Sequence, residues 1–357
     1  MFNKVETVSK KANKPKLLIF ADMVLCGFKY GAGYVDYDVI GFYKLSPKQR
    51  KTMLTRGKND KIVKKLNNKK YWHLFNNKNE FNLFFARFIG RDWVIINKDN
   101  ITKNLFKNEE FIKFKHFIRK HPVFFAKPND GQCGKGIQKV SLDNLNKYFK
   151  DNGINYQRYS DLVKSYSIDS NEEDLEIKCL FKSLIDNKLY LNEEPINQHH
   201  VMNKLNPSCV NTIRLVTIMN KKKEVTILAS FVRIGNGVNV VDNFNSGGMT
   251  ARVSLETGKI IEAAINKEGK IFEKHPTTNE KIEGFQIPFF EEAKNMVKEA
   301  ATLSENVRYV GWDVAITENG PTLVEGNQFP GHDIYQVAEK LDENSVGVWP
   351  EFKKALK

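Results

Sequence analysis

Long apolar segments and closely spaced cysteines are both missing from this sequence of 357 residues. No apolar run approaches the ~20 residues that a helix needs to span a bilayer, and the basic residues 1–16 lack the apolar segment of a secretory signal. The cysteines stand too far apart for a metal-ligand pattern, which favours free thiols in a reducing compartment. We therefore expect a cytoplasmic protein. The cysteines are Cys26, Cys133, Cys179 and Cys209.

An excess of acidic side chains is missing too, because the net charge is +14. Such a charge suits nucleic acid, an acidic small substrate or the anionic face of a membrane. No zinc-finger spacing and no RNP-like aromatic pattern supports nucleic acid, and the lysines are scattered among asparagines. His199 and His200 are adjacent rather than spaced as ligands of one zinc ion. We expect neither nucleic acid nor zinc, and peripheral contact with membrane-linked glycan machinery stays open.

The first third of the chain has mainly helical patterns. Residues 14–31 carry an apolar helical face, which favours a core helix over a helix lying at a membrane interface, although both remain open. Residues 108–121 place phenylalanines at helical spacing and end before Pro122, which disfavours helix in the residue that precedes it. The chain is long enough for two or three subdomains.

From residue 123 onward, strand patterns alternate with turns and only a few helical patterns. The alternation predicts an α+β protein with an antiparallel sheet and no internal repeats. The expected elements are strands at 123–128 and 137–140, a helix, turn and strand at 174–196, an antiparallel sheet at 212–266, a helix at 290–303 and a hairpin at 309–327.

Two acidic residues and an amide lie on the two strands of that last hairpin. Asp313 is twelve positions before Glu325, and Asn327 has the same parity as Glu325. Side chains of equal parity share one face of a strand, and a tight hairpin can bring Asp313 beside them. Carboxylate and amide oxygens suit magnesium. A solvent-facing strand pair is the alternative, but the apolar neighbours of these acids make an unpaired charge there costly.

A lysine followed by a glycine-rich turn provides a second signal. Lys127 ends an apolar strand, and residues 131–136 read Gly-Gln-Cys-Gly-Lys-Gly. A lysine can neutralise phosphate while the backbone N–H groups of such a loop cradle it. No Gly-Lys-Ser/Thr sequence opens a helix here, so this is not a Walker A motif. An ordinary turn would give the same pattern.

Two arginines stand in strand-like apolar surroundings. Arg214 follows Asn211-Thr212-Ile213, and Arg233 lies on the next expected strand. A fixed guanidinium suits bidentate binding of a carboxylate or phosphate, and a structural salt bridge is an equally good explanation for either residue alone. The glycines of residues 241–248 would let the backbone approach a ligand closely.

The order of these signals resembles the ATP-grasp family across roughly residues 121–333. Within that family the chain looks most like the sugar-transfer-associated subgroup linked to cell-surface polysaccharide synthesis. The closer resemblance rests on EEPINQH, NPSCVNTIRLVT, DNFNSGGM, KIEGFQIPFF and RYVGWDVAITENGPTLVEGNQFPGHD.

The resemblance implies a fold, a set of subdomains and a set of site residues. It implies the ATP-grasp fold, in which two α+β subdomains clasp ATP, after an N-terminal mostly helical subdomain. The expected divisions are 1–120, 121–196 for the small subdomain with its glycine-rich lid, and 197–357 for the large subdomain with the magnesium site. The implied ATP contacts are Lys78, Lys127, Gly131, Gln132, Gly134, Gly136, Glu193, Glu194, Ile196 and Gln198; the implied catalytic residues are Arg214, Arg233 and Asn211; and the implied ligands of two magnesium ions are Asp313, Glu325 and Asn327.

Within these implied roles, Glu194 and its neighbours would form the hinge that receives adenine, and Gln198 would lie near the ribose. Lys78 is the candidate for the family's earlier phosphate-binding lysine, with a solvated surface position as the alternative. Gly326 departs from the family, whose members usually carry an apolar residue there, and this departure is expected to loosen the strand. No obligatory general base is seen; His275 and His332 are the nearest candidates, and each more readily shapes a loop.

The activity implied by the resemblance is a magnesium- and ATP-dependent ligation of a carboxylate to an amine through an acyl phosphate. The subgroup suggests a uronic-acid-type sugar or glycan as the acid and an amino acid or amine as the nucleophile. Two other classes stay open: a kinase on the same scaffold, and a basic module that binds nucleic acid or an anionic membrane without catalysis.

Overall fold

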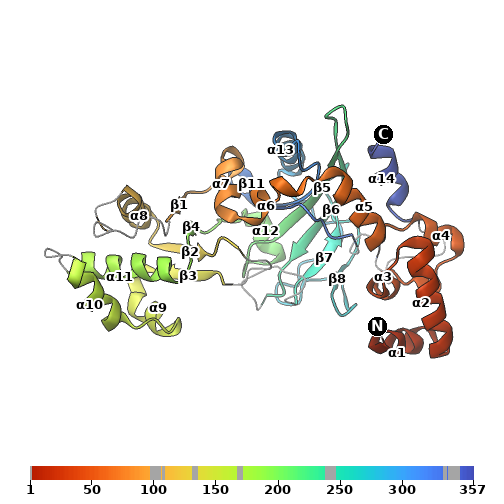
Figure 1. Ribbon diagram of the computed structural model, residues 1–357, viewed down its shortest axis with the longest axis horizontal. Helices are drawn as coiled ribbons and strands as arrows, with labels where there is room; N and C mark the ends of the chain where they lie inside the picture. Colours follow the sequence, from red (N-terminus) through yellow and green to blue (C-terminus); the bar gives the residue numbers. More distant parts are fainter. Residues whose placement is uncertain are drawn as a thin grey trace.

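The computed structural model contains helices and two antiparallel sheets, arranged along an elongated molecule (Figure 1). A four-stranded sheet lies at one end, a seven-stranded sheet lies in the middle, and N-terminal helices form the other end. This arrangement confirms the α+β class. The structure describes residues 2–96, 106, 109–130, 136–166, 172–237, 247–332, 336 and 346–357.

The N-terminal part is helical, as its patterns predicted. Two of its helices begin with a side-chain N-cap. The Ser46 hydroxyl accepts a hydrogen bond from the Gln49 backbone N–H, and the Thr55 hydroxyl accepts one from the Lys58 backbone N–H. The α-helices are α1 (Phe2–Ala12), α2 (Lys16–Tyr30), α3 (Tyr34–Val39), α4 (Pro47–Thr52), α5 (Arg56–Leu66), α6 (His73–Asn76) and α7 (Lys78–Phe84), and the 3-10 helices are η1 (Phe42–Lys44), η2 (Lys69–Tyr71) and η3 (Ala86–Phe88).

The four-stranded sheet has one face covered by helices and one face turned toward the large sheet. Phe124 and Ala126 pack into a cluster with helices, whereas Lys127 has the opposite parity and lies on the other face. The strand order is β1 (Trp93–Ile95), β4 (Leu191–Glu193), β2 (Val123–Lys127) and β3 (Gln138–Ser141), and the helices are α8 (Glu109–Lys120), η5 (Leu142–Asn144), α9 (Leu145–Asp151), α10 (Tyr156–Tyr166) and α11 (Glu172–Asp186).

The seven-stranded sheet also has two unlike faces. On one face Trp312 and Val314 belong to a core that includes Val297 of the long helix α13. On the other face, Tyr309 packs with Phe352 at one end, and the charged residues of the candidate site lie farther along. The strand order is β11 (Gly320–Asn327), β10 (Tyr309–Thr317), β5 (Thr212–Met219), β6 (Val225–Ile234), β7 (Met249–Arg252), β8 (Ala264–Asn266) and β9 (Ile271–Phe272), with helices α12 (His200–Leu205), α13 (Phe290–Leu303) and α14 (Trp349–Ala355).

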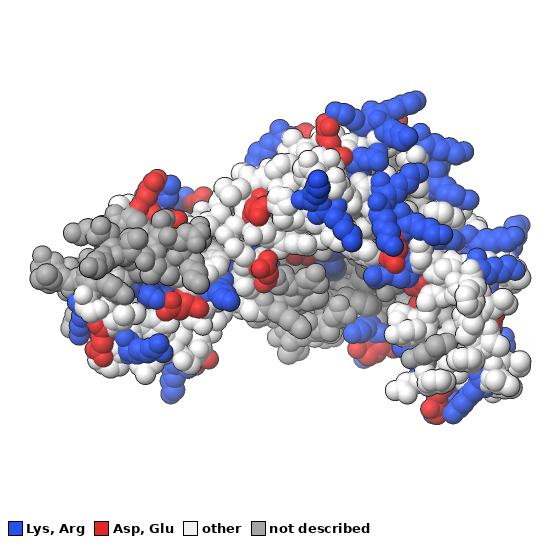
Figure 2. Space-filling model, in the orientation of Figure 1, with Lys and Arg blue, Asp and Glu red and all other residues white. Residues whose placement is uncertain are grey.

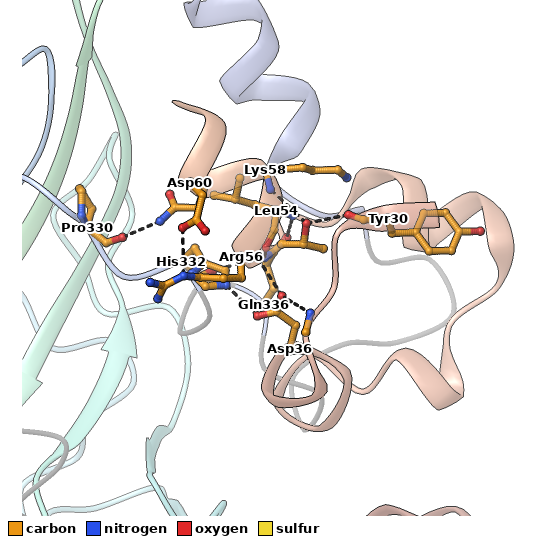
Figure 3. Close-up of polar contacts among 12 residues, drawn as sticks. Tyr30, Asp36, Leu54, Arg56, Lys58, Asp60, Pro330, His332 and Gln336 are labelled. Carbon is orange, nitrogen blue, oxygen red and sulfur yellow. Dashed lines mark hydrogen bonds and ion pairs between the residues drawn. The ribbon is translucent and has the colours of Figure 1, made fainter. Parts of the chain in front are cut away.

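Buried hydrogen bonds fasten the N-terminal helices to the C-terminal segment (Figure 3). Asp36 accepts a hydrogen bond from the Arg56 backbone at 2.7 Å and pairs with His332 at 2.8 Å. The Gln336 amide both accepts from and donates to the Leu54 backbone, at 2.9 and 3.0 Å. The contacts of Asp36 with His332 and of Leu54 with Gln336 join residues 296 and 282 positions apart, so they anchor the helical part to the large sheet.

The expected division at residue 120 remains a prediction. In the structure β1 and α8 precede that position, yet both pack with the four-stranded sheet. The region between α7 and α8 therefore contributes to the small sheet as well as to the N-terminal part.

Candidate functional site

The candidate site is organised by a β-bulge in the hairpin of β10 and β11. Thr317 pairs with Gly320 at the turn, and a regular register from there would set Asp313 opposite Val324. The register shifts between Asp313 and Val314, so Asp313 pairs with Glu325 instead. A bulge of one extra residue produces this shift. The two carboxylates consequently share one face of the sheet.

Asp313 lies between acidic and basic neighbours. It pairs with Arg214 on the adjacent strand β5, where a bidentate ion pair forms, and its Oδ2 atom also accepts from Arg233 of β6 at 2.9 Å. Burial alone would raise the pKa of Asp313, but the charges of the two arginines outweigh burial and lower the pKa to about 2. Asp313 is therefore ionised at neutral pH, and its carboxylate fixes both guanidinium groups.

Glu325 has the opposite electrostatic situation. Burial, the charge of Asp313 and a hydrogen bond to Asp313 raise the pKa of Glu325, and the arginines offset this only in part. The amide of Asn327 donates to Glu325 Oε1 at 3.3 Å. Glu325 therefore resists ionisation beside the charged Asp313. An added cation would stabilise the state in which both carboxylates are ionised.

Across from this face, the small sheet contributes Lys127. Its ammonium group pairs with Glu193 of β4, which also accepts hydrogen bonds from Arg91 at 2.7 Å and Asn82 at 2.6 Å. Burial would raise the pKa of Glu193, but the charges of Arg91 and Lys127 hold it well below its usual range. The ionised Glu193 therefore fixes the position of the Lys127 ammonium group.

Arg91 and Asn82 are functional-site neighbours that the sequence did not indicate. Arg91 donates to Glu193 of the small sheet and to the Leu323 carbonyl of β11 at 2.7 Å, so it links the two sheets. It precedes the three-residue strand β1, which is too short to show alternation. The sequence around Arg91 therefore gives no indication that this arginine links the two sheets.

Lys78 lies where the two sheets approach each other. It begins α7 and is half-buried, and its backbone N–H donates to the Asn129 carbonyl at 3.1 Å. Burial lowers the pKa of Lys78, while Glu325 of the large sheet opposes that shift and Lys127 of the small sheet adds to it. The structure therefore brings Lys78 near both acidic and basic members of the site, instead of onto the solvated surface.

Gln198 and Asn211 take part in a buried network of their own. The Gln198 amide oxygen accepts two hydrogen bonds from Asn211, at 2.7 and 2.9 Å, and its nitrogen donates to Asn203 and to the Asn206 carbonyl. Asn211 also accepts from the Gly235 backbone. This network fixes the start of β5, and the ribose and catalytic roles of the two residues remain predictions.

The expected hinge follows β4. Glu194 donates its backbone N–H to the Asp92 carbonyl at 3.0 Å, and its carboxylate lies 3.2 Å from His121. Ile196 is half-buried two residues later. The connection thus runs directly from Glu193 at the site to the large sheet, where Gln198 pairs with Thr317.

Three expected phosphate contacts, Gly131, Gln132 and Gly134, lie outside the described residues. Gly136, at the end of the same loop, is described and has a φ of 77°, a conformation that favours glycine.

The two histidines that were the nearest candidates for a general base form hydrogen bonds elsewhere. His275 bonds to the Gly235 carbonyl at 2.8 Å, and His332 pairs with Asp36.

Gly326 has a packing role between the two candidate ligands of β11. A Cβ atom there would lie 2.9 Å from the Phe75 ring and 3.0 Å from the Phe81 ring. Both rings belong to the core beside Trp312. The aromatic rings therefore fill the space that an apolar side chain would otherwise need.

Replacing Gly326 by alanine is expected to destabilise the protein by about 1–3 kcal/mol, because buried rings must move to admit the methyl group. Chemical denaturation measures the change. Gly90→Ala is the matched control, since its Cβ would meet Thr322 at an ordinary 3.7 Å. Equal effects of the two substitutions would contradict the packing role.

Comparison with known proteins gives a family match and distant structural neighbours. A family profile described as sugar-transfer associated ATP-grasp matches residues 57–344. No curated protein matches the chain. Similar solved structures include D-alanine–D-alanine ligase from Helicobacter pylori (15% identity, 74% of this chain and 57% of that one, TM-score 0.37), D-alanine–D-alanine ligase from Coxiella burnetii (10%, 84% and 61%, 0.39) and N5-carboxyaminoimidazole ribonucleotide synthetase from Thermotoga maritima (10%, 78% and 53%, 0.35). The chain thus spans less than two thirds of the length of each.

Proposed function

The chain belongs to the sugar-transfer associated ATP-grasp family and has the ATP-grasp fold, and we propose that it is an ATP-dependent ligase joining a carboxylate to an amine. One observation carries the proposal. Asp313 and Glu325 lie opposite each other on two paired strands, and Arg214 and Arg233 form ion pairs with Asp313. One small area therefore offers hard oxygen ligands and two fixed cations.

The residues present fit magnesium and ATP. Asp313, Glu325 and Asn327 offer the carboxylate and amide oxygens that magnesium prefers. A divalent cation held by Asp313 and Glu325 would favour the ionised form of Glu325, whose pKa is raised beside the ionised Asp313. Lys127 and Lys78 supply positive charge from the facing elements, as phosphate groups require. When bound, magnesium would neutralise the negative charge that develops on the nucleotide phosphates.

In the proposed reaction an oxygen of the substrate carboxylate attacks the γ-phosphorus of ATP, and the bond to the β-phosphate oxygen breaks to release ADP. The amine nitrogen then attacks the acyl carbon of the acyl phosphate, phosphate leaves, and the nitrogen loses a proton. Lys127 holds the transferred phosphate, and Arg214 and Arg233 stabilise the oxygens of the acyl phosphate. Their fixed pairing with Asp313 means that little reorganisation is needed.

We further propose that the carboxylate belongs to a uronic-acid-type sugar or glycan of a surface polysaccharide and that the amine is an amino acid or simple amine. The family description, sugar-transfer associated, supports a sugar acceptor. The net charge of +14 agrees with an acidic substrate.

The test is a coupled assay of ADP release with magnesium, ATP, uronate-type acids and a panel of amines. The expected result is ADP release that requires both the acid and the amine, with an amide product seen by mass spectrometry. Formation of a phosphate monoester without any amine would overturn the proposal in favour of a kinase. ATP binding without turnover across a broad panel would count against the sugar acid and leave the nucleotide site standing.

A further inference from the structure

Helix α2 is apolar on both sides, although only one side is buried. Its charged residues are Lys16 at its start, Asp22 in its middle and Lys29 in its last turn. The buried side packs into the N-terminal helical core through Ile19, Met23, Cys26 and Tyr30. The expectation of a core helix therefore holds for one side of α2 only.

The other side of α2 is an exposed apolar face. Phe28 is 89% exposed and Leu17 is 77% exposed, fractions that are unusual for large apolar side chains. At 100° per residue the exposed apolar positions fall within an arc of about 120°. We call this arc the α2 face; it consists of the half-buried Val24 and the exposed Leu17, Leu18, Ala21, Leu25 and Phe28.

The aromatic ring of Phe2 in α1 extends the α2 face. The ring of Phe2, itself 78% exposed, stacks on Phe20 of α2 with centroids 6.1 Å apart. In Figure 2 the end of the molecule that holds α1, α2 and α3 shows a broad area without charged groups, with lysine and arginine along its upper edge and groups of both signs along its lower edge. Contiguous exposed apolar surface of this kind marks a site of interaction with a membrane or another protein.

The charges around the α2 face are mainly positive. Lys14 and Lys16 stand at one end of the helix and Lys29 at the other. The acidic groups nearby are already neutralised: Asp22 forms a bidentate pair with Arg50 at 2.8 Å, and Glu6 lies within 3.4 Å of two lysines.

We propose that the α2 face docks on an anionic lipid bilayer, with α2 lying in the interface. Large apolar side chains flanked by lysines are what an interfacial helix presents to such a surface. None of the described helices is long and apolar enough to cross a membrane. A second copy of the chain fits less well, because its own lysines would meet those around the first face. This proposal does not depend on the ligase activity.

The test is co-sedimentation of the full chain, without nucleotide, with vesicles of phosphatidylcholine alone or mixed equally with phosphatidylglycerol. The test variant is Leu25→Gln/Phe28→Gln, which keeps a good helix former at both positions. The matched control is Ile112→Gln/Ile271→Gln, because these residues are 60% and 52% exposed on other elements. Circular dichroism and light scattering establish folding and oligomeric state for each protein.

The expected result is binding to the anionic vesicles that falls roughly tenfold or more in the α2 variant and little in the control. Rising salt should also weaken binding, because the lysines contribute. Absence of binding to either vesicle would overturn the proposal, as would equal binding to the neutral vesicles. If light scattering shows that the wild-type and control proteins are dimers and the α2 variant is a monomer, the α2 face is a self-association surface instead.

Discussion

Replacing Glu325 by glutamine is expected to reduce ATP-dependent turnover by roughly 100- to 1000-fold while leaving the fold intact. The amide has nearly the same shape but cannot serve as the second anionic ligand opposite Asp313. The coupled ADP assay measures the loss. Glu318→Gln, in the turn of the same hairpin, is the matched control and should retain full activity, since Glu318 pairs with His200 at the surface.

Although Glu325→Gln should lose activity, its thermal stability should be equal to or higher than that of the wild type. The pKa of Glu325 is raised in the folded protein, so the free energy of unfolding falls as the pH rises above the unfolded value of about 4.5. Glutamine has no such charge. We expect thermal unfolding of Glu325→Gln at pH 7 to occur at or above the wild-type temperature. Full activity, or a large loss of stability, would contradict the assignment.

Asp313 is less suitable for this test because its removal has two consequences. The same substitution that deletes a magnesium ligand would leave Arg214 buried without its bidentate partner. An uncompensated buried charge is strongly destabilising. Loss of activity in an Asp313 variant would therefore not separate ligand loss from partial unfolding, whereas Glu325→Gln does.

The strands and the long helix of the large sheet could be predicted from the sequence. Alternation and turn residues predicted the antiparallel sheet at 212–266, which contains β5 and β6, and helical spacing predicted a helix at 290–303, where α13 lies. These patterns are local, because each buried face repeats every two or 3.6 residues. Local pattern also placed Lys127 at the end of a strand.

The arrangement of the site could be predicted only in part. The equal parity of Glu325 and Asn327 was readable, but their alignment with Asp313 depends on a bulge at Val324 that no residue type marks. The packing of Gly326 was equally hidden, because its partners Phe75 and Phe81 lie some 250 positions away. Long-range contacts of this kind leave no periodic trace in the sequence.

Replacing Arg91 by methionine is expected to lower the free energy of unfolding by about 3–5 kcal/mol. Methionine keeps much of the volume but leaves the fully buried Glu193 with Lys127 as its one remaining charged partner among the described residues. It also removes the hydrogen bond to the Leu323 carbonyl. Urea unfolding at pH 7 measures the change. Arg87→Met is the matched control, since that arginine is exposed and pairs loosely with Glu299 at 3.6 Å.

The pH dependence distinguishes loss of the ion pair from loss of packing. The pKa of Glu193 is depressed in the folded state, so its contribution to stability is present above the unfolded value of about 4.5 and is lost as the pH falls toward the folded pKa. In Arg91→Met the folded pKa should rise, and the difference from wild type should shrink as the pH is lowered from 7 to 4. A difference that is the same at every pH would mean that Arg91 acts through packing alone. In that case Arg91 would still join the sheets, but Glu193 would not depend on it to hold Lys127 in the site.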